Sequence, residues 1–173
     1  MKALIISDSH RDQAILEQLT TKFAGQVDIM IHCGDSELPS DQVKNMGLIS
    51  VRGNNDDDKI YPFEEVIEKD KVKFLVVHGH LDQVVSSLTP LMLKAQSIGA
   101  NIVCYGHTHQ LAVTVEKGIL FINPGSITLP RGEYTSLGGT MAIVEVRPTE
   151  FIVDYYKRNG DSIPELHFEF SRK

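Results

Sequence analysis

The sequence lacks the features that would direct a protein into a membrane or through one. No apolar run approaches the roughly 18 residues that a membrane-spanning helix needs. The opening Met1-Lys2 leads into only a few apolar residues before Ser7 and Asp8, which is unlike a signal peptide. We therefore expect a soluble, cytoplasmic protein without a membrane partner.

Basic residues are in the minority. The chain has 17 Lys and Arg against 23 Asp and Glu, which gives a formal net charge of -6. A non-specific nucleic-acid binder normally carries a basic face, so we expect no stable binding of nucleic acid. The negative charge does not exclude a phosphate substrate, because bound cations can reverse the charge locally.

Cysteine is scarce, and sequence repeats, linkers and low-complexity segments are absent. The two cysteines, Cys33 and Cys104, both stand at the ends of predicted buried strands, and we expect reduced thiols there. A chain of 173 residues with 42% hydrophobic residues can bury a sizeable core. We therefore expect one domain over residues 1–173.

Strand and helix patterns alternate in the first part of the chain, and hairpin patterns follow. Helices are predicted at 11–22, 39–45 and 86–98, and strands at 2–7, 27–33, 48–52, 61–68, 72–77, 102–104, 111–116, 119–122, 139–146, 151–156 and 166–170. The early alternation implies parallel strands with right-handed crossovers. Together the two patterns predict two sheets packed face to face, with helices outside.

Five of the predicted strands lead directly into residues that can bind a metal. These segments are Asp8-Ser9-His10, Gly34-Asp35, Gly53-Asn54-Asn55-Asp56, His78-Gly79-His80 and Gly106-His107-Thr108-His109. In open α/β sheets, ligands collect at the carboxyl ends of the strands. We therefore expect the five segments to meet at one edge.

Each segment alone has an ordinary explanation. Asp8 could cap the following helix, the Gly-Asp and Gly-Asn pairs are common in turns, and His107 and His109 could be a hydrogen-bonded surface pair. Together they favour a metal site, because they offer seven hard or intermediate donors and need no thiolate. The candidate ligands are Asp8, His10, Asp35, Asn54, His78, His107 and His109.

This donor mixture suits Mn²⁺, Fe or Zn²⁺ and is too rich in nitrogen for Ca²⁺. Seven ligands exceed what one tetrahedral ion would take. They would serve two ions, about 3.5–4 Å apart, that share a carboxylate.

The motifs, in this order, resemble those of the calcineurin-like metallophosphoesterase superfamily. The turn Asn123-Pro124-Gly125-Ser126 is similar to that of the small bacterial and archaeal phosphodiesterases, relatives of the retromer scaffold subunit. The resemblance implies a four-layer αββα sandwich of two mixed β-sheets with helices outside.

The same resemblance implies a binuclear, metal-dependent phosphodiesterase in which a hydroxide between the metals attacks phosphorus in line. Asp8, His10, Asp35 and His109 would hold the first metal. Asp35 would bridge to a second metal that is completed by Asn54, His78 and His107. Mn is expected first, with Ni, Fe, Zn or Co as alternatives, and the partner would be a phosphate ester. A homo-oligomer is left open.

One position departs from the common superfamily pattern. Many members have a His after the Gly-Asn pair, where it contacts the phosphate and assists the leaving group, whereas this chain has Asn55. Asn can donate a hydrogen bond to phosphate but has no proton to transfer near neutral pH. The predicted catalytic residues are therefore Asp35, Asn55 and His80, with His80 alternatively a supporting or solvent-facing residue.

Other polar residues are expected to have structural roles. His32 is interpreted as a core residue and His167 as a surface residue. Asp56-Asp57-Asp58 is interpreted as a solvated loop in which Asp56 could orient a neighbour. Arg131 could contact the substrate phosphate or form a structural salt bridge.

Two other functions compete with this interpretation. A non-catalytic, protein-binding scaffold on the same fold is the alternative, and a degenerate metal site would indicate it; here every expected ligand is present. A hydrolase of the metallo-β-lactamase type would need a compact His-x-His-x-Asp-His run, which the sequence lacks.

Overall fold

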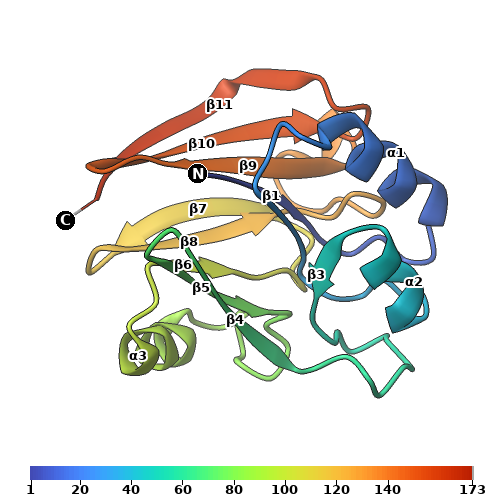
Figure 1. Ribbon diagram of the computed structural model, residues 1–173, viewed down its shortest axis with the longest axis horizontal. Helices are drawn as coiled ribbons and strands as arrows, with labels where there is room; N and C mark the ends of the chain where they lie inside the picture. Colours follow the sequence, from blue (N-terminus) through green and yellow to red (C-terminus); the bar gives the residue numbers. More distant parts are fainter. Residues whose placement is uncertain (173) are drawn as a thin grey trace.

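Two β-sheets form the body of the protein (Figure 1). The computed structural model describes residues 1–172. The six-stranded sheet has the order β11-β10-β9-β1-β2-β3 and the five-stranded sheet the order β4-β5-β6-β8-β7. Within this range no helix has both the length and the apolar character needed to cross a membrane.

The elements have the following bounds. The six-stranded sheet contains β1 (Lys2–Ile6), β2 (Ile29–His32), β3 (Leu48–Ser50), β9 (Thr140–Val146), β10 (Glu150–Lys157) and β11 (Ser162–Ser171). The five-stranded sheet contains β4 (Glu64–Lys69), β5 (Val72–Val77), β6 (Ile102–Cys104), β7 (Leu111–Glu116) and β8 (Ile119–Pro124). The helices are α1 (Gln13–Phe23), α2 (Ser40–Asn45), α3 (Thr89–Ile98) and the short 3₁₀ helix η1 (Thr135–Leu137).

Both sheets are mixed. Strands β1, β2 and β3 are parallel, as the alternating sequence pattern predicts, and β9 joins β1 in the antiparallel direction. In the other sheet β5, β6 and β8 are parallel, and β4 and β7 are antiparallel edges.

Several predicted boundaries differ from the structure, and a proline lies near two of them. β11 begins at Ser162 rather than at residue 166, and it runs through Pro164. An edge strand tolerates a proline, because its N–H can face solvent. Helix α3 begins at Thr89 rather than at residue 86, with Pro90 in its first turn, where a proline is favoured.

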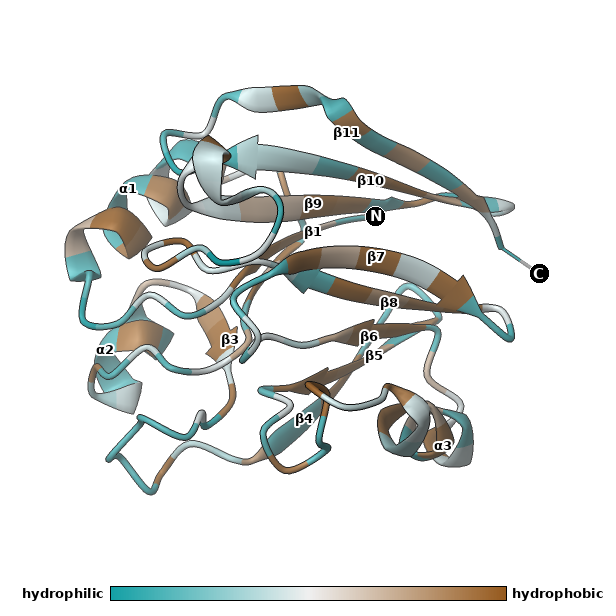
Figure 2. Ribbon diagram, turned by 180° about the vertical axis from the view of Figure 1, so that it is seen from behind, coloured by the Kyte–Doolittle hydropathy of each residue, from teal (hydrophilic) through white to brown (hydrophobic). Residues whose placement is uncertain are grey.

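Three apolar layers hold the sandwich together. Residues such as Ile5, Phe74 and Ile122 fill the space between the sheets. Helices α1 and α2 pack on the outer face of the six-stranded sheet, where Leu16 lies in one cluster with Leu4. Helix α3 packs in the same way on the five-stranded sheet. Figure 2 shows the hydrophobic colour concentrated on the central strands. The predicted four-layer αββα sandwich is confirmed.

The hydroxyl of Tyr155 connects the two sheets directly. Tyr155 lies on β10 and is fully buried. Its hydroxyl oxygen is 2.9 Å from the carbonyl oxygen of Ala112 on β7 and 3.0 Å from that of Asn123 on β8, and it donates to them. Burial raises the pKa of Tyr155 well above its usual value, so the phenol keeps the proton that it donates.

We predict that Tyr155→Phe lowers the free energy of unfolding by about 1–3 kcal/mol, because two buried carbonyl groups lose a donor. Urea denaturation would measure the change. Tyr156→Phe is the matched control, since the hydroxyl of this half-buried neighbour forms no hydrogen bond within residues 1–172, and its effect should stay below about 0.5 kcal/mol. Equal effects of the two substitutions would contradict the proposed connection.

Candidate metal centre

The five predicted segments meet where the carboxyl ends of strands from both sheets come together. The five segments meet at one edge, as predicted, but this edge is formed by two packed sheets rather than by a single sheet. The loops after β1, β2 and β3 supply Asp8, His10, Asp35 and Asn54, and the loops after β5 and β6 supply His78, His107 and His109. Backbone bonds join neighbouring loops: the N–H of Asp8 donates to Gly34 O (3.1 Å), and the N–H of Gly106 donates to His78 O (3.0 Å).

The donor atoms form two overlapping groups. Those of Asp8, His10 and His109 all lie within 4.8 Å of one another, and so do those of Asp8, Asp35 and His78. Asp8 therefore belongs to both groups. The Oδ1 atom of Asn54 lies 3.1 Å from His78 Nε2.

His107 completes the set of seven candidate ligands. Its ring centroid lies 5.2 Å from that of His78, and its backbone N–H donates to Asp8 Oδ2. The structure thus brings all seven predicted ligands together.

Three histidines are held so that Nε2 faces the centre. In each ring Nδ1 donates to an oxygen that can only accept: Glu37 Oε1 for His10 (2.8 Å), Cys33 O for His78 (2.7 Å) and Leu129 O for His109 (2.8 Å). A neutral ring with its proton on Nδ1 has a lone pair on Nε2. The Nε2 atoms of His10 and His109 are only 3.3 Å apart, so in this tautomer their lone pairs face each other.

The carboxylate of Asp8 supports the same interpretation. Its Oδ1 atom is buried and has no hydrogen-bond partner, although it lies 3.2 Å from His109 Nε2. Burial alone would raise the pKa of Asp8, but the contact with His109 and the charge of His78 hold it below its usual value. A buried charged oxygen facing imidazole lone pairs calls for a cation, and the donor set therefore fits a bound metal.

The pKa values of two candidate ligands, His78 and His109, show the same demand for positive charge, whereas burial and the charge of His78 lower the pKa of His107. The contact with Asp8 raises the pKa of His109 against the effect of burial. Burial would lower the pKa of His78, but the contact with Asp35 and the charge of Asp8 raise it. Protons and metal ions thus compete for the same Nε2 atoms.

Asn55 holds Asp35 in place. Its backbone N–H donates to Asp35 Oδ1 (2.8 Å) and its side-chain amide to Asp35 Oδ2 (2.6 Å). Burial would raise the pKa of Asp35, but His78 and Asn55 hold it far below its usual value. The amide for which the sequence predicted a contact with phosphate therefore contacts a candidate ligand in this structure.

Asp56 joins two of the ligand loops. Its carboxylate accepts from the backbone N–H groups of Asp35 (2.8 Å), Glu37 (2.7 Å) and Gly53 (2.7 Å), and it is buried. The prediction of a solvated residue is wrong for Asp56, because three loop N–H groups need an acceptor there. The predicted role of Asp56 in orienting a neighbour is confirmed.

The backbone of the centre is strained. Five of the seven candidate ligands have positive φ: Asp8 (53°), His10 (44°), Asp35 (56°), His107 (68°) and His109 (59°). Each such residue costs about 1–3 kcal/mol and persists only where its surroundings determine it. Close approach adds a second constraint, because a Cβ on Gly53 would lie 2.0 Å from Asp35 Oδ1.

The turn at Asn123–Ser126 supports the centre from behind. The hydroxyl of Ser126 donates to Asp8 O (2.8 Å), and the amide of Asn123 donates to Gly106 O (2.9 Å). Both side chains are fully buried. The turn therefore positions the backbone of two ligand loops.

The remaining predicted residues lie either at the edge of the metal centre, here called the rim, or farther from it. His80 is half-buried with its ring centroid 5.4 Å from that of His78, and its buried Nδ1 has no hydrogen-bond partner. Arg131 is exposed and forms no ion pair within residues 1–172, so the predicted alternative of a salt bridge is not realised there. His32 is buried and hydrogen-bonded to Ser9, and His167 is on the surface, both as predicted.

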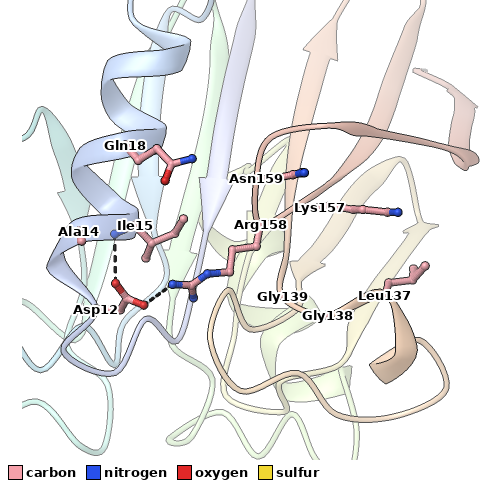
Figure 3. A pocket seen from close by; sticks show the side chains of 10 residues that line it. All are labelled: Asp12, Ala14, Ile15, Gln18, Leu137, Gly138, Gly139, Lys157, Arg158 and Asn159. Carbon is pink, nitrogen blue, oxygen red and sulfur yellow. Dashed lines mark hydrogen bonds and ion pairs between the residues drawn. The ribbon is translucent and has the colours of Figure 1, made fainter.

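A separate pocket of about 420 Å³ lies beside the start of α1 (Figure 3). Two of its charged groups satisfy each other, because Arg158 donates to Asp12 and Asp12 also caps α1 by accepting from the N–H of Ile15. Arg158 further donates to Ile127 O (3.0 Å). None of the candidate ligands lines this pocket, and its charged network is structural.

Comparisons with known proteins agree with the fold and the donor set. Residues 1–149 match the profile described as the Calcineurin-like phosphoesterase superfamily domain. The chain is 36% identical over 166 residues to a protein of Bacillus subtilis named probable metallophosphoesterase YsnB, covering 96% of each chain.

Solved structures give the same result. A predicted phosphoesterase from Streptococcus pneumoniae superimposes with a TM-score of 0.94 at 38% identity, covering 99% of this chain and 97% of that one. A single-mutant form of Vps29 from Entamoeba histolytica shares the fold with a TM-score of 0.73 at 22% identity over 100% of both chains. The predicted superfamily and its small branch are thus confirmed, and the chain belongs to the calcineurin-like phosphoesterase superfamily.

Proposed function

We propose that this protein is a binuclear, metal-dependent phosphodiesterase. The observation that carries the proposal is the buried, unpartnered Oδ1 of Asp8, which faces the Nε2 atoms of His78 and His109. When bound, two divalent ions activate water for attack on phosphorus and neutralise the charge that develops on its oxygens.

The ligand assignment follows the resemblance. Asp8, His10, Asp35 and His109 would hold one ion, and Asp35, Asn54, His78 and His107 the other. The two donor groups of the structure meet at Asp8 rather than at Asp35, and their overlap supports two closely spaced ions. Mn²⁺ is the proposed ion.

The protein's own residues would hold this arrangement and bind the substrate. Asn55 and Asp56 fix the carboxylate and backbone of Asp35. His80 and Arg131 stand at the rim with nitrogen atoms that lack protein partners within residues 1–172, and we place them toward the phosphoryl oxygens of the ester.

The scaffold alternative makes a different prediction. A scaffold would keep the fold and have no turnover, so a screen of the purified protein against phosphate mono- and diesters, with metal content measured in parallel, separates the two. The single domain over residues 1–173, the cytoplasmic location, the possible homo-oligomer and the absence of nucleic-acid binding stay predictions.

Asp35 provides the first test of the metal centre. Elemental analysis of the protein loaded with Mn²⁺ should give about two ions per chain. Asp35→Asn removes a negative charge from between the ions, and it should lower the metal content and abolish turnover. Asp70→Asn, in the exposed turn between β4 and β5, is the matched control and should change neither. A folded wild-type protein without bound metal would contradict the proposal.

Asn55 provides a test of the supporting hydrogen bonds. Asn55→Ala removes the bond to Asp35 Oδ2 but keeps the backbone bond to Oδ1, so we expect metal affinity to fall about 10- to 100-fold. Competition with a chelator would measure this. Asn159→Ala, on the exposed β10–β11 turn, is the control and should leave the metal affinity unchanged. If Asn55→Ala binds metal as tightly as the wild-type protein, the hydrogen bond from its side chain to Asp35 is not needed for metal binding.

The leaving group provides a third test. Asn55 stands where many superfamily members have a His that assists the leaving group. Without that acid, a poor leaving group should depart slowly. Bis(4-nitrophenyl) phosphate should therefore turn over at least about a hundredfold faster than a dialkyl phosphate. Steady-state rates of the Mn²⁺-loaded protein would measure the ratio. Similar rates for both esters would reveal another proton donor.

A further inference from the structure

We infer that a groove beside the metal centre binds an apolar organic group of the phosphate ester. The groove has a volume of about 510 Å³, and His107 lies in its wall. His107 is also a candidate metal ligand, so the groove opens directly onto the centre. This inference rests on the proposed function and specifies the substrate class.

The groove combines apolar and polar walls in similar measure. Val84, Val85, Leu88 and Leu111 line it, together with the ring of Tyr105. Val85 is 72% exposed, so most of its side chain is available to contact a ligand. Small-molecule sites of this size typically combine such walls with a few polar groups that fix orientation.

Several polar side chains in the groove have no partner within residues 1–172, and two of them are suited to an anion. One is the guanidinium of Arg131, whose charge acts on the neighbouring His109. The other is the hydroxyl of Tyr105, a phenol that can donate a hydrogen bond. A cation in a chain of net charge -6 that has no carboxylate partner is suited to an anionic ligand.

A second groove beside the centre offers different chemistry. Its volume is about 320 Å³, and its lining includes the carboxylates of Glu37, Asp57 and Asp58. Its one arginine, Arg11, is already paired with Glu37 at 2.9 Å. This groove would repel an anionic ester, so we place the apolar group in the groove that contains Val85.

Two non-hydrolysable ligands test the inference on the Mn²⁺-loaded protein. Methylphosphonate and naphthylmethylphosphonate share the anionic head and differ in the apolar group. Calorimetry should show that the naphthyl compound binds at least about tenfold more tightly. Equal affinities, or no binding of either compound, would overturn the inference.

Three variants locate the binding site. Val85→Ser should reduce the affinity ratio at least about threefold, whereas Leu93→Ser, on the exposed face of α3, should preserve it. Arg131→Gln should weaken both ligands to a similar extent, because it removes charge rather than apolar contact. An unchanged ratio in Val85→Ser would place the naphthyl group elsewhere and overturn the inference.

Turnover separates this inference from the proposed function. If the protein hydrolyses bis(4-nitrophenyl) phosphate but binds both phosphonates equally, the proposed apolar binding site is refuted and the proposed phosphodiesterase activity is supported. If the protein does not hydrolyse the diester but shows the expected ratio of phosphonate affinities, the proposed phosphodiesterase activity is refuted and the groove is supported as a ligand site.

Discussion

The need to neutralise buried negative charge at the seam between the sheets governs the arrangement of the site. Asp8 and Asp35 are both almost fully buried, and Asp8 Oδ1 has no hydrogen-bond donor. Without a cation at this seam, burying two carboxylates would be unfavourable, and neutral residues would be expected in their place. The positive φ values and the close approach of Gly53 to Asp35 are understandable as costs that a bound metal offsets.

Most of the fold was predictable from periodicity, because the central strands are continuous apolar runs bounded by turn residues. β6, for example, coincides with the predicted 102–104. The candidate ligands were predictable for a related reason: each follows the end of such a strand. The convergence of two sheets on one centre was implied by the superfamily resemblance rather than by any local pattern.

The supporting interactions could not be predicted in the same way. Asp56 is one of three consecutive aspartates, and nothing local distinguishes it from Asp57, which is exposed. Its role depends on three N–H groups that only the folded loops bring together. The contact of Asn55 with Asp35 likewise depends on the approach of two loops 20 residues apart.

The division of the ligands between two sheets has a consequence for biogenesis. Asp8 and His109 are separated by 101 positions in the chain, and they can meet only after the six-stranded and five-stranded sheets have docked. Long-range contacts of this kind form late in folding, because loop closure must come first. The complete centre therefore forms only once the two sheets have docked, and metal binding would stabilise the docked sandwich. A partly folded chain would present the local pairs Asp8 and His10, and His107 and His109, apart from each other, and would compete poorly for scarce metal.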